Sequence, residues 1–246
     1  MKTLKQWSGK LPAFPHLDRY FRRRRKRRFL ENSDIDEVFT RIFRKKSWGG
    51  SVSASGAGSD PEQTQVLVEK LGSLLADLEI ESMLDIPCGD FEWMRHVAGD
   101  AVRYTGGDIV QELVQQNRQA YEQESVRFLC LNLVRDTLPD ADLILCRDGL
   151  VHLSFEDVLK ALKNICSTRS TYLLATTFTD RKENQDILSG QWRTLNLERP
   201  PFNLDSPMRI INEESPHQGG LYADKSMGLW KIEAVRKCLE AQEYST

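Results

Sequence analysis

Residues 82–110 constrain the fold of this chain more than any other stretch of its sequence. The apolar run over 83–86 is typical of a buried parallel strand, and a tight glycine turn follows it. The pattern then predicts a helix over 91–97 and a second strand over 102–107, directly before Asp108. A strand, a glycine turn, a helix, a second strand and an acidic residue form the layout of a nucleoside-binding βαβ unit. The alternative is an ordinary turn in an α/β core with acidic residues on its surface.

The residues of the turn distinguish between two kinds of nucleoside cofactor. Gly89 lets a ligand approach the backbone closely, but Pro87 lacks the N–H group that a dinucleotide pyrophosphate needs. Asp90 would also place a negative charge beside the phosphates. A cofactor with a cationic amino-acid end fits better, because Asp85 and Asp90 can serve its ammonium or sulfonium group. Asp108 can accept hydrogen bonds from both ribose hydroxyls. S-adenosylmethionine (SAM) is such a cofactor.

Three motifs, in the right order, resemble those of class I SAM-dependent methyltransferases. The segment 85–91 (Asp-Ile-Pro-Cys-Gly-Asp-Phe) resembles the first motif of that family, Asp108 matches its ribose-binding acid, and residues 142–153 resemble its fourth-strand motif. Of the family pattern Asp-x-Gly-x-Gly-x-Gly this chain keeps only the middle glycine, Gly89, which indicates a subgroup. The resemblance covers residues 62–178 well. It implies a Rossmann-like α/β fold with a seven-stranded, mostly parallel sheet flanked by helices.

The same resemblance implies a set of cofactor-binding residues, which are Asp85, Pro87, Gly89, Asp90, Asp108, Ile109, Asn132 and Leu133. Asn132 follows a third predicted strand, over 126–131, where family members usually carry an acidic residue that meets the adenine amino group. The amide oxygen of Asn132 can accept the same N–H group, although less strongly than a charged oxygen. Alternatively, Asn132 only forms a turn at the end of the strand.

Three polar residues follow the fourth predicted strand, over 141–146, whose carboxyl end should face the ligand. We expect Asp148 to lie nearest the transferred methyl group, where a carboxylate or an imidazole can take a proton from a substrate hydroxyl. His152 is either that base, because imidazole titrates near neutral pH, or a structural residue of the loop. Arg147 either pairs with an anion of the substrate or braces Asp148.

Two helices are predicted before the first strand. One begins at Ser33, and the other begins at Ser59 after a Gly/Ser-rich loop over 47–59; each start resembles a capping box. In related methyltransferases the segment before the first strand folds over the SAM pocket, so we expect residues 48–63 to form a lid. Its candidate contacts are Ser55, Gln63 and Thr64. The alternative is a flexible linker.

Residues 179–226 form a long polar stretch after a fifth predicted strand, over 172–178. A structureless stretch of this length is unusual unless it is functional, and in the resembled family this region often shapes the acceptor pocket. Its expected lining residues are Trp192, Arg193, Asn196, Phe202 and Glu213. Aromatic rings beside polar groups suit a saccharide or another hydroxylated metabolite, and the alternative is surface cover. A final pair of strands is expected at 209–211 and 228–232.

The N-terminal part carries a block of charge. We read residues 1–46 as a basic, helical extension of a methyltransferase domain over 47–246. Residues 22–28, from Arg22 to Arg28, are seven consecutive cations, which repel one another and attract anions. Their partner can be an anionic membrane surface or RNA. Alternatively, the run is a solvated surface without a partner.

Composition narrows the class of protein and its compartment. An apolar content of 40%, a charged content of 28% and a net charge of −2 are typical of a soluble globular protein. We find no apolar run long enough to span a membrane and no signal peptide. Five cysteines without a Cys-x-x-Cys pair indicate a reducing compartment, so we expect a cytoplasmic protein, either free or peripheral at a membrane. Cys88 and Cys146 read as small buried residues, and the spacing predicts no metal site.

The predicted activity is methyl transfer from SAM to an oxygen or nitrogen of a small hydroxylated acceptor, with a saccharide preferred. Because the sulfonium is already a strong electrophile, the protein mainly aligns the reactants and removes one proton. One alternative is an RNA methyltransferase recruited by residues 22–28. The aromatic motif that holds a flipped base in amino-methylating enzymes is absent after the fourth strand, which counts against it. The other is a non-catalytic SAM-binding protein that docks on membranes.

Overall fold

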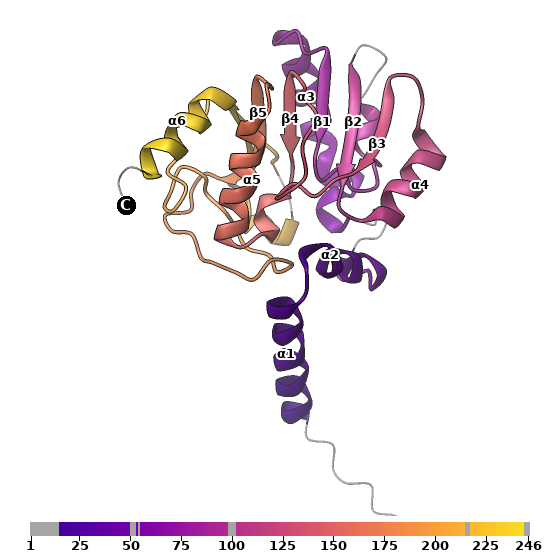
Figure 1. The fold of residues 1–246 in the computed structure, drawn as a ribbon, viewed down its shortest axis with the longest axis vertical. Helices are drawn as coiled ribbons and strands as arrows, with labels where there is room; N and C mark the ends of the chain where they lie inside the picture. The colour runs from indigo at the N-terminus through magenta and orange to yellow at the C-terminus, as the bar shows by residue number, and fades with distance from the viewer. Residues whose placement is uncertain (1–14, 50–52, 54, 98–101, 215–216, 244–246) are drawn as a thin grey trace, which may run out of the picture. The chain divides into compact units, whose positions relative to one another are not determined.

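The computed structural model describes residues 15–49, 53, 55–97, 102–214 and 217–243. Its contacts divide the chain into two compact units, residues 1–33 and residues 34–246. The first unit contains the helix α1 (Pro15–Asn32), drawn in dark indigo in Figure 1. Within the described ranges, no helix is long and apolar enough to cross a membrane.

The second unit is built on one seven-stranded sheet, with the strand order β3-β2-β1-β4-β5-β7-β6. Strands β1 to β5 run parallel, and β7 lies antiparallel to both β5 and β6. This arrangement confirms the predicted Rossmann-like fold and its final antiparallel strands. The strands are β1 (Ser82–Asp85), β2 (Arg103–Asp108), β3 (Val126–Cys130), β4 (Leu143–Cys146), β5 (Tyr172–Phe178), β6 (Arg209–Asn212) and β7 (Lys225–Lys231).

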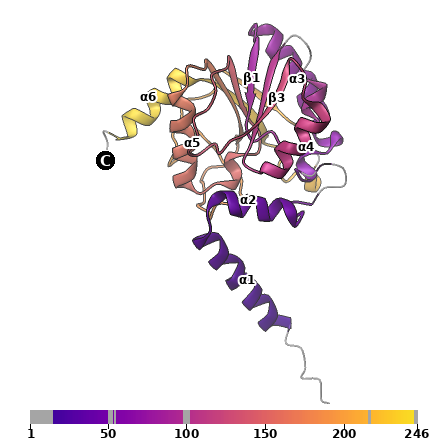
Figure 2. The same cartoon turned by 45° about the vertical axis from the view of Figure 1, so that its right-hand side comes forward.

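Helices cover both faces of the sheet, and Figures 1 and 2 show α3 and α5 on opposite sides of it. This explains why β4, a central parallel strand, is apolar throughout: all four of its residues are buried. The α-helices of this unit are α2 (Ile35–Arg44), α3 (Pro61–Asp77), α4 (Gln111–Tyr121), α5 (Phe155–Ser167) and α6 (Ile232–Glu243). The short 3₁₀ helices of the described chain are η1 (Ala57–Ser59), η2 (Met94–His96), η3 (Leu150–His152) and η4 (His217–Gly220).

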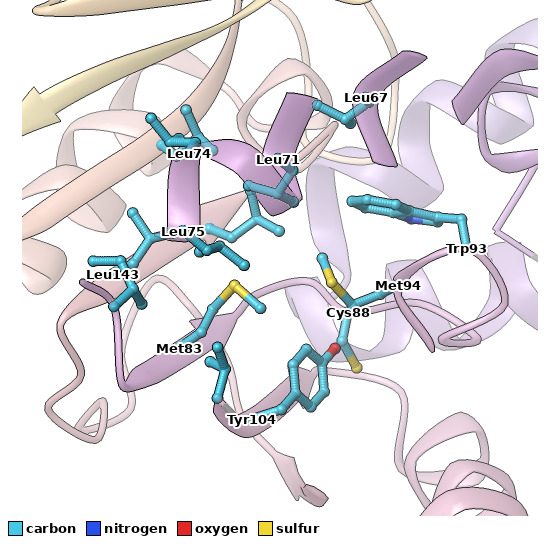
Figure 3. Packing of buried hydrophobic residues seen from close by; sticks show 14 of the residues in the cluster. Leu67, Leu71, Leu74, Leu75, Met83, Cys88, Trp93, Met94, Tyr104 and Leu143 are labelled. Atoms are coloured by element: carbon cyan, nitrogen blue, oxygen red, sulfur yellow. The ribbon is translucent and has the colours of Figure 1, made fainter. Parts of the chain in front are cut away.

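One hydrophobic core lies between α3 and the sheet. The predicted leucine stripe of α3 supplies Leu67, Leu71, Leu74 and Leu75, which pack with Met83 and Leu143 of β1 and β4 (Figure 3). Trp93, Met94 and Tyr104 extend the same cluster toward the turn after β1 (Figure 3). Because this core fixes β1 and β4 side by side, it also fixes the loops that leave their carboxyl ends.

The helix predicted over 91–97 is wrong. This segment consists of turns and the short η2, and the backbone of Phe91 is left-handed, with φ +61°. A residue in that conformation cannot continue an α-helix. The ring of Phe91 instead packs between Tyr104 and Phe128, at centroid distances of 4.8 and 5.2 Å.

Two of the predicted helix caps are also wrong. Asp34 rather than Ser33 caps α2, and its side chain accepts a hydrogen bond from the Asp36 N–H. The residue at the start of α3 is Asp60 rather than Ser59, and its carboxylate bonds to the Ser53 N–H instead of its own helix.

Candidate functional site

A cavity lies at the carboxyl ends of the parallel strands, where ligands bind in open α/β sheets. We call it the central cavity; it encloses about 970 Å³ including its open mouth. The loops after β1, β2, β3 and β4 form one wall, and α2 with Trp48 forms the other. Its lining includes nine of the predicted site residues: Pro87, Gly89, Asp108, Ile109, Asn132, Leu133, Arg147, Asp148 and His152.

The turn after β1 is held from two sides. Gly89 has φ +58°, and its N–H donates to the Asp108 carboxylate at 3.2 Å. Asn117 of α4 donates to the Gly89 carbonyl at 2.7 Å. A Cβ atom at Gly89 would lie 2.2 Å from the Ser55 hydroxyl oxygen, so only glycine allows this approach.

Asp108 at the end of β2 presents a largely buried carboxylate to the central cavity. Its other oxygen accepts from the Val110 N–H at 2.9 Å. Burial raises the pKa of Asp108 to about 6, partly offset by these N–H groups, so the group is mainly ionised at pH 7. Each oxygen keeps acceptor capacity, which is what two vicinal ribose hydroxyls require.

Asp85 and Asp90 do not line the central cavity, contrary to the expectation that both face the cofactor. Asp85 is buried beside β2 and accepts a hydrogen bond from the Tyr104 hydroxyl at 2.8 Å; burial raises its pKa to about 7. Asp90 accepts from the hydroxyls of Ser53 and Ser55 at 2.8 and 3.3 Å. Asp90 therefore anchors the loop that precedes α3 to the turn after β1.

The predicted lid is partly present at the central cavity. Trp48, Ser55 and Ser59 line it, whereas Gln63 and Thr64 do not. The Thr64 hydroxyl instead donates to the Asp60 carbonyl of its own helix at 3.3 Å. Residues 50–52 and 54 of the predicted lid lie outside the described part of the chain.

Asn132 forms the turn that the sequence offered as one of its two alternatives. Its amide oxygen accepts from the Val134 N–H at 2.9 Å, which is the turn expected at a strand end, and the residue also lines the cavity. Its amide nitrogen donates to Asp36 of α2 at 2.7 Å. The amide is therefore fixed in orientation by two partners.

Four charges, three of them buried and Asp148 half-buried, lie beneath the loop after β4, and we call them the charge quartet: Arg147, Asp148, Glu213 and Lys225. Arg147 donates to both oxygens of Glu213, at 3.2 and 2.7 Å. The Lys225 ammonium lies 2.6 Å from Asp148 and 3.3 Å from Glu213. Two cations balance two anions, so no buried charge in the quartet lacks a counter-charge.

Asp148 is held as a carboxylate by this arrangement. Its backbone has φ +54°, and its N–H donates to the Thr176 hydroxyl at 2.8 Å. Burial alone would raise its pKa, but Lys225 and Arg147 outweigh that effect and lower the pKa to about 2. A carboxylate with so low a pKa is a weak proton acceptor, so Asp148 does not suit the role of general base near neutral pH.

His152 is better suited to that role. Its Nδ1 lies 2.8 Å from the Gln191 carbonyl oxygen, which can only accept, so Nδ1 carries the hydrogen and Nε2 keeps its lone pair. Burial lowers the pKa of His152, which keeps the ring neutral at pH 7. The ring also packs on Trp48 at a centroid distance of 5.4 Å.

Three predicted substrate residues do not line the central cavity. Glu213 is buried as the partner of Arg147. Arg193 donates to the carbonyls of Leu150 and Gln185, at 3.0 and 3.1 Å, so it holds loops together. Trp192 is 43% exposed and lies edge to face with Tyr222 at 5.1 Å. Asn196 and Phe202, named with them, are buried structural residues.

Sequence reasoning missed two contributions to the site. Lys225 stands alone in the sequence, and only the pairing of β7 with β5 brings it to Asp148. The helix α2 was not among the predicted site elements, but Ile35, Phe39 and Phe43 line the cavity. Among the described residues, no group of three or more His, Cys, Asp or Glu side chains could hold a metal ion.

The comparisons with known proteins agree with this geometry. Residues 83–169 match a family described as a methyltransferase domain, and no curated protein matches the chain. Among solved structures, PigF with SAH has a TM-score of 0.52 and 13% identity, over 69% of this chain and 56% of that one. The methyltransferase domain of bacterial CtHen1-CN has a TM-score of 0.50 and 13% identity, over 69% of this chain and 99% of that one.

A third similar structure is the N-methyltransferase NodS from Bradyrhizobium japonicum WM9 in complex with S-adenosyl-L-homocysteine (SAH). Its TM-score is 0.46 and its identity 13%, over 56% of this chain and 72% of that one. The fold and the site define a Rossmann-like protein with a ligand cavity at the carboxyl ends of its strands. The match of residues 83–169 to a methyltransferase domain supports the predicted class. The subgroup indicated by the motif at 85–91 stays a prediction.

Proposed function

We propose that this protein binds SAM in the central cavity and transfers its methyl group to an oxygen or nitrogen of a small hydroxylated acceptor. The observation that carries the proposal is the presence of the Asp108 carboxylate, the Gly89 turn and an imidazole with a free Nε2 in one cavity.

Residues after the different strands would each contact a different part of SAM. Asp108 would accept hydrogen bonds from the ribose hydroxyls. Ile109, Leu113 and Leu133 offer apolar contact for the adenine, with the Asn132 amide at its edge. Pro87 and Gly89 line the cavity at the turn after β1, where the methionyl end would lie.

We propose His152 as the general base and Asp148 as its electrostatic partner. When bound, SAM supplies a methyl group on a sulfonium, which is an electrophile without further activation. His152 Nε2 takes the acceptor's proton as the acceptor oxygen forms its bond to the methyl carbon, and the electrons of the broken carbon–sulfur bond stay on sulfur. The ionised Asp148 favours the imidazolium that results, and Lys225 keeps Asp148 ionised and fixed.

We favour a saccharide or a similar hydroxylated ring as the acceptor. The support is the aromatic pair of the exposed Trp192 and the half-buried Tyr222, since sugar rings stack on such surfaces. Both chain neighbours of Trp192 bond to the segment of the proposed base. The Gln191 carbonyl accepts from His152, and the Arg193 N–H donates to the Val151 carbonyl at 3.2 Å.

Thermal unfolding with and without SAM tests the cofactor. At 100-fold excess over Kd, binding stabilises the folded state by about 2.7 kcal/mol, which raises Tm by roughly 5–10 °C in a chain of this size. We expect this shift in the wild type and in Asp77→Asn, at the end of α3, but not in Asp108→Asn. No shift in the wild type at millimolar SAM would contradict the proposal.

Transfer is tested by a screen of sugars and hydroxylated metabolites, with SAH production as the readout. We expect His152→Ala to lower kcat by about 10²–10⁴-fold and to leave SAM binding unchanged. Binding of SAM without turnover on any acceptor would favour the non-catalytic alternative.

A further inference from the structure

The helix α1 carries a surface that the proposed methyl transfer does not use. We call residues 23–28 (Arg-Arg-Arg-Lys-Arg-Arg) the cationic segment, and all six of their side chains are exposed. Successive residues of an α-helix are 100° apart, so six of them cover the whole circumference. The cationic segment therefore presents positive charge in every direction around the helix axis.

This charge is mostly unbalanced. Arg27 pairs with Glu31 at 2.7 Å, and the other five cations form no ion pair with another described residue. Adjacent like charges repel one another and raise the local potential. An external polyanion would relieve that repulsion, which makes the segment a surface for binding negative charge.

The structure favours a nucleic acid over a membrane as the source of that charge. A helix that lies in a membrane surface buries an apolar face. Among residues 23–32, the part of α1 whose side chains the structure describes, no large apolar side chain is exposed, and Phe29 and Leu30 are half-buried. A nucleic acid instead offers closely spaced phosphates that cations on several sides of one helix can reach.

We propose that the cationic segment of α1 docks this protein on the phosphate backbone of nucleic acids, without reading their sequence. Arg and Lys contacts to phosphates fix position but carry no sequence information. This proposal is independent of the acceptor of the methyl group, since it concerns a different unit of the chain.

The salt dependence of binding tests the proposal on the full-length chain. Fluorescence anisotropy with a 20-base-pair DNA duplex and a 20-nucleotide RNA strand of mixed sequence gives the slope of log K against log salt. Six phosphate contacts predict slopes of about −5 for the duplex and about −4 for the single strand. A variant with Arg23→Gln, Arg24→Gln, Arg25→Gln and Lys26→Gln should reduce either slope by roughly 3 and weaken binding at least 100-fold in low salt.

A matched control removes four exposed cations elsewhere, by Arg103→Gln, Lys182→Gln, Arg199→Gln and Lys231→Gln. Both variants change the net charge equally, and circular dichroism checks that each keeps its helices. We expect the control to bind like the wild type. An equal loss in the control would overturn the proposal in favour of a general charge effect. Binding to phosphatidylserine vesicles but to neither oligonucleotide would overturn it in favour of a membrane.

Discussion

Gly89 couples the turn after β1 to the loop before α3, because the Ser55 side chain occupies the space that a Cβ of residue 89 would need. We expect Gly89→Ala to destabilise the protein by about 1–3 kcal/mol, since the new Cβ meets the Ser55 hydroxyl and the backbone is left-handed there. Gly72→Ala is the control: it lies inside α3 with open space around it, and it should stabilise by up to about 1 kcal/mol. Urea unfolding measures both, and equal effects would contradict the argument.

Asp85 makes the stability of the protein depend on pH near neutrality. Its pKa is about 7 in the fold, above its ordinary value of 3.8. A carboxyl group with a raised pKa contributes stability below pH 4 that is lost as the pH rises toward 7. Asn at this position can still accept a hydrogen bond from Tyr104. Between pH 4.5 and 7.5, the free energy of unfolding of Asp85→Asn should therefore fall by less than that of the wild type, and the difference should be at most about 4 kcal/mol. Identical pH profiles of wild type and variant, from urea unfolding, would exclude this role.

At the scale of one element, α2 forms one wall of the central cavity. It is tied down by the pair of Arg44 and Glu112 on α4 and by Arg135, which pairs with Asp34 at 2.9 Å. These pairs are exposed and contribute little each, so the buried side chains of α2 hold it in place. Phe39 is one of them, and it also lines the cavity.

Truncating Phe39 should therefore loosen α2 and weaken ligand binding at the same time. We expect Phe39→Ala to cost about 3 kcal/mol and to speed amide hydrogen exchange across residues 35–44. SAM affinity should fall in the same variant, by calorimetric titration. Arg44→Met is the control, with a stability change below about 1 kcal/mol. Unchanged exchange in Phe39→Ala would show that α2 is held by other contacts.

At the scale of the whole molecule, the site depends on strand pairings between distant parts of the chain. Lys225 lies 77 residues after Asp148, yet their side chains are 2.6 Å apart because β7 pairs with β5. Removing one partner of a buried ion pair leaves an uncompensated charge, so Lys225→Met should cost about 3–5 kcal/mol at pH 7. Lys225→Arg should recover part of that loss. A change below about 1 kcal/mol in Lys225→Met, by urea unfolding, would mean that water solvates Asp148 instead.

The sequence was sufficient to predict features whose residues lie close together in the chain. The strand and turn pattern predicted β1 to β5, and it placed Gly89, Asp108 and Asn132 at strand ends, where they line the cavity. It was insufficient where a side chain's partner is distant in the chain. Asp85 was assigned to the cofactor because nothing local reveals its bond to Tyr104. Glu213 was assigned to the acceptor because its partner, Arg147, lies 66 residues before it.

The charge quartet also constrains how the chain can be synthesised and folded. The chain emerges from the ribosome N-terminus first, so Arg147 and Asp148 leave it well before Glu213 and Lys225. A nascent chain that has formed β1 to β5 therefore holds a cation and an anion at the end of β4 without their later partners. Burying them at that stage would be costly, so the loop after β4 should stay hydrated until the last two strands arrive. The charge quartet is thus completed only by the final third of the chain.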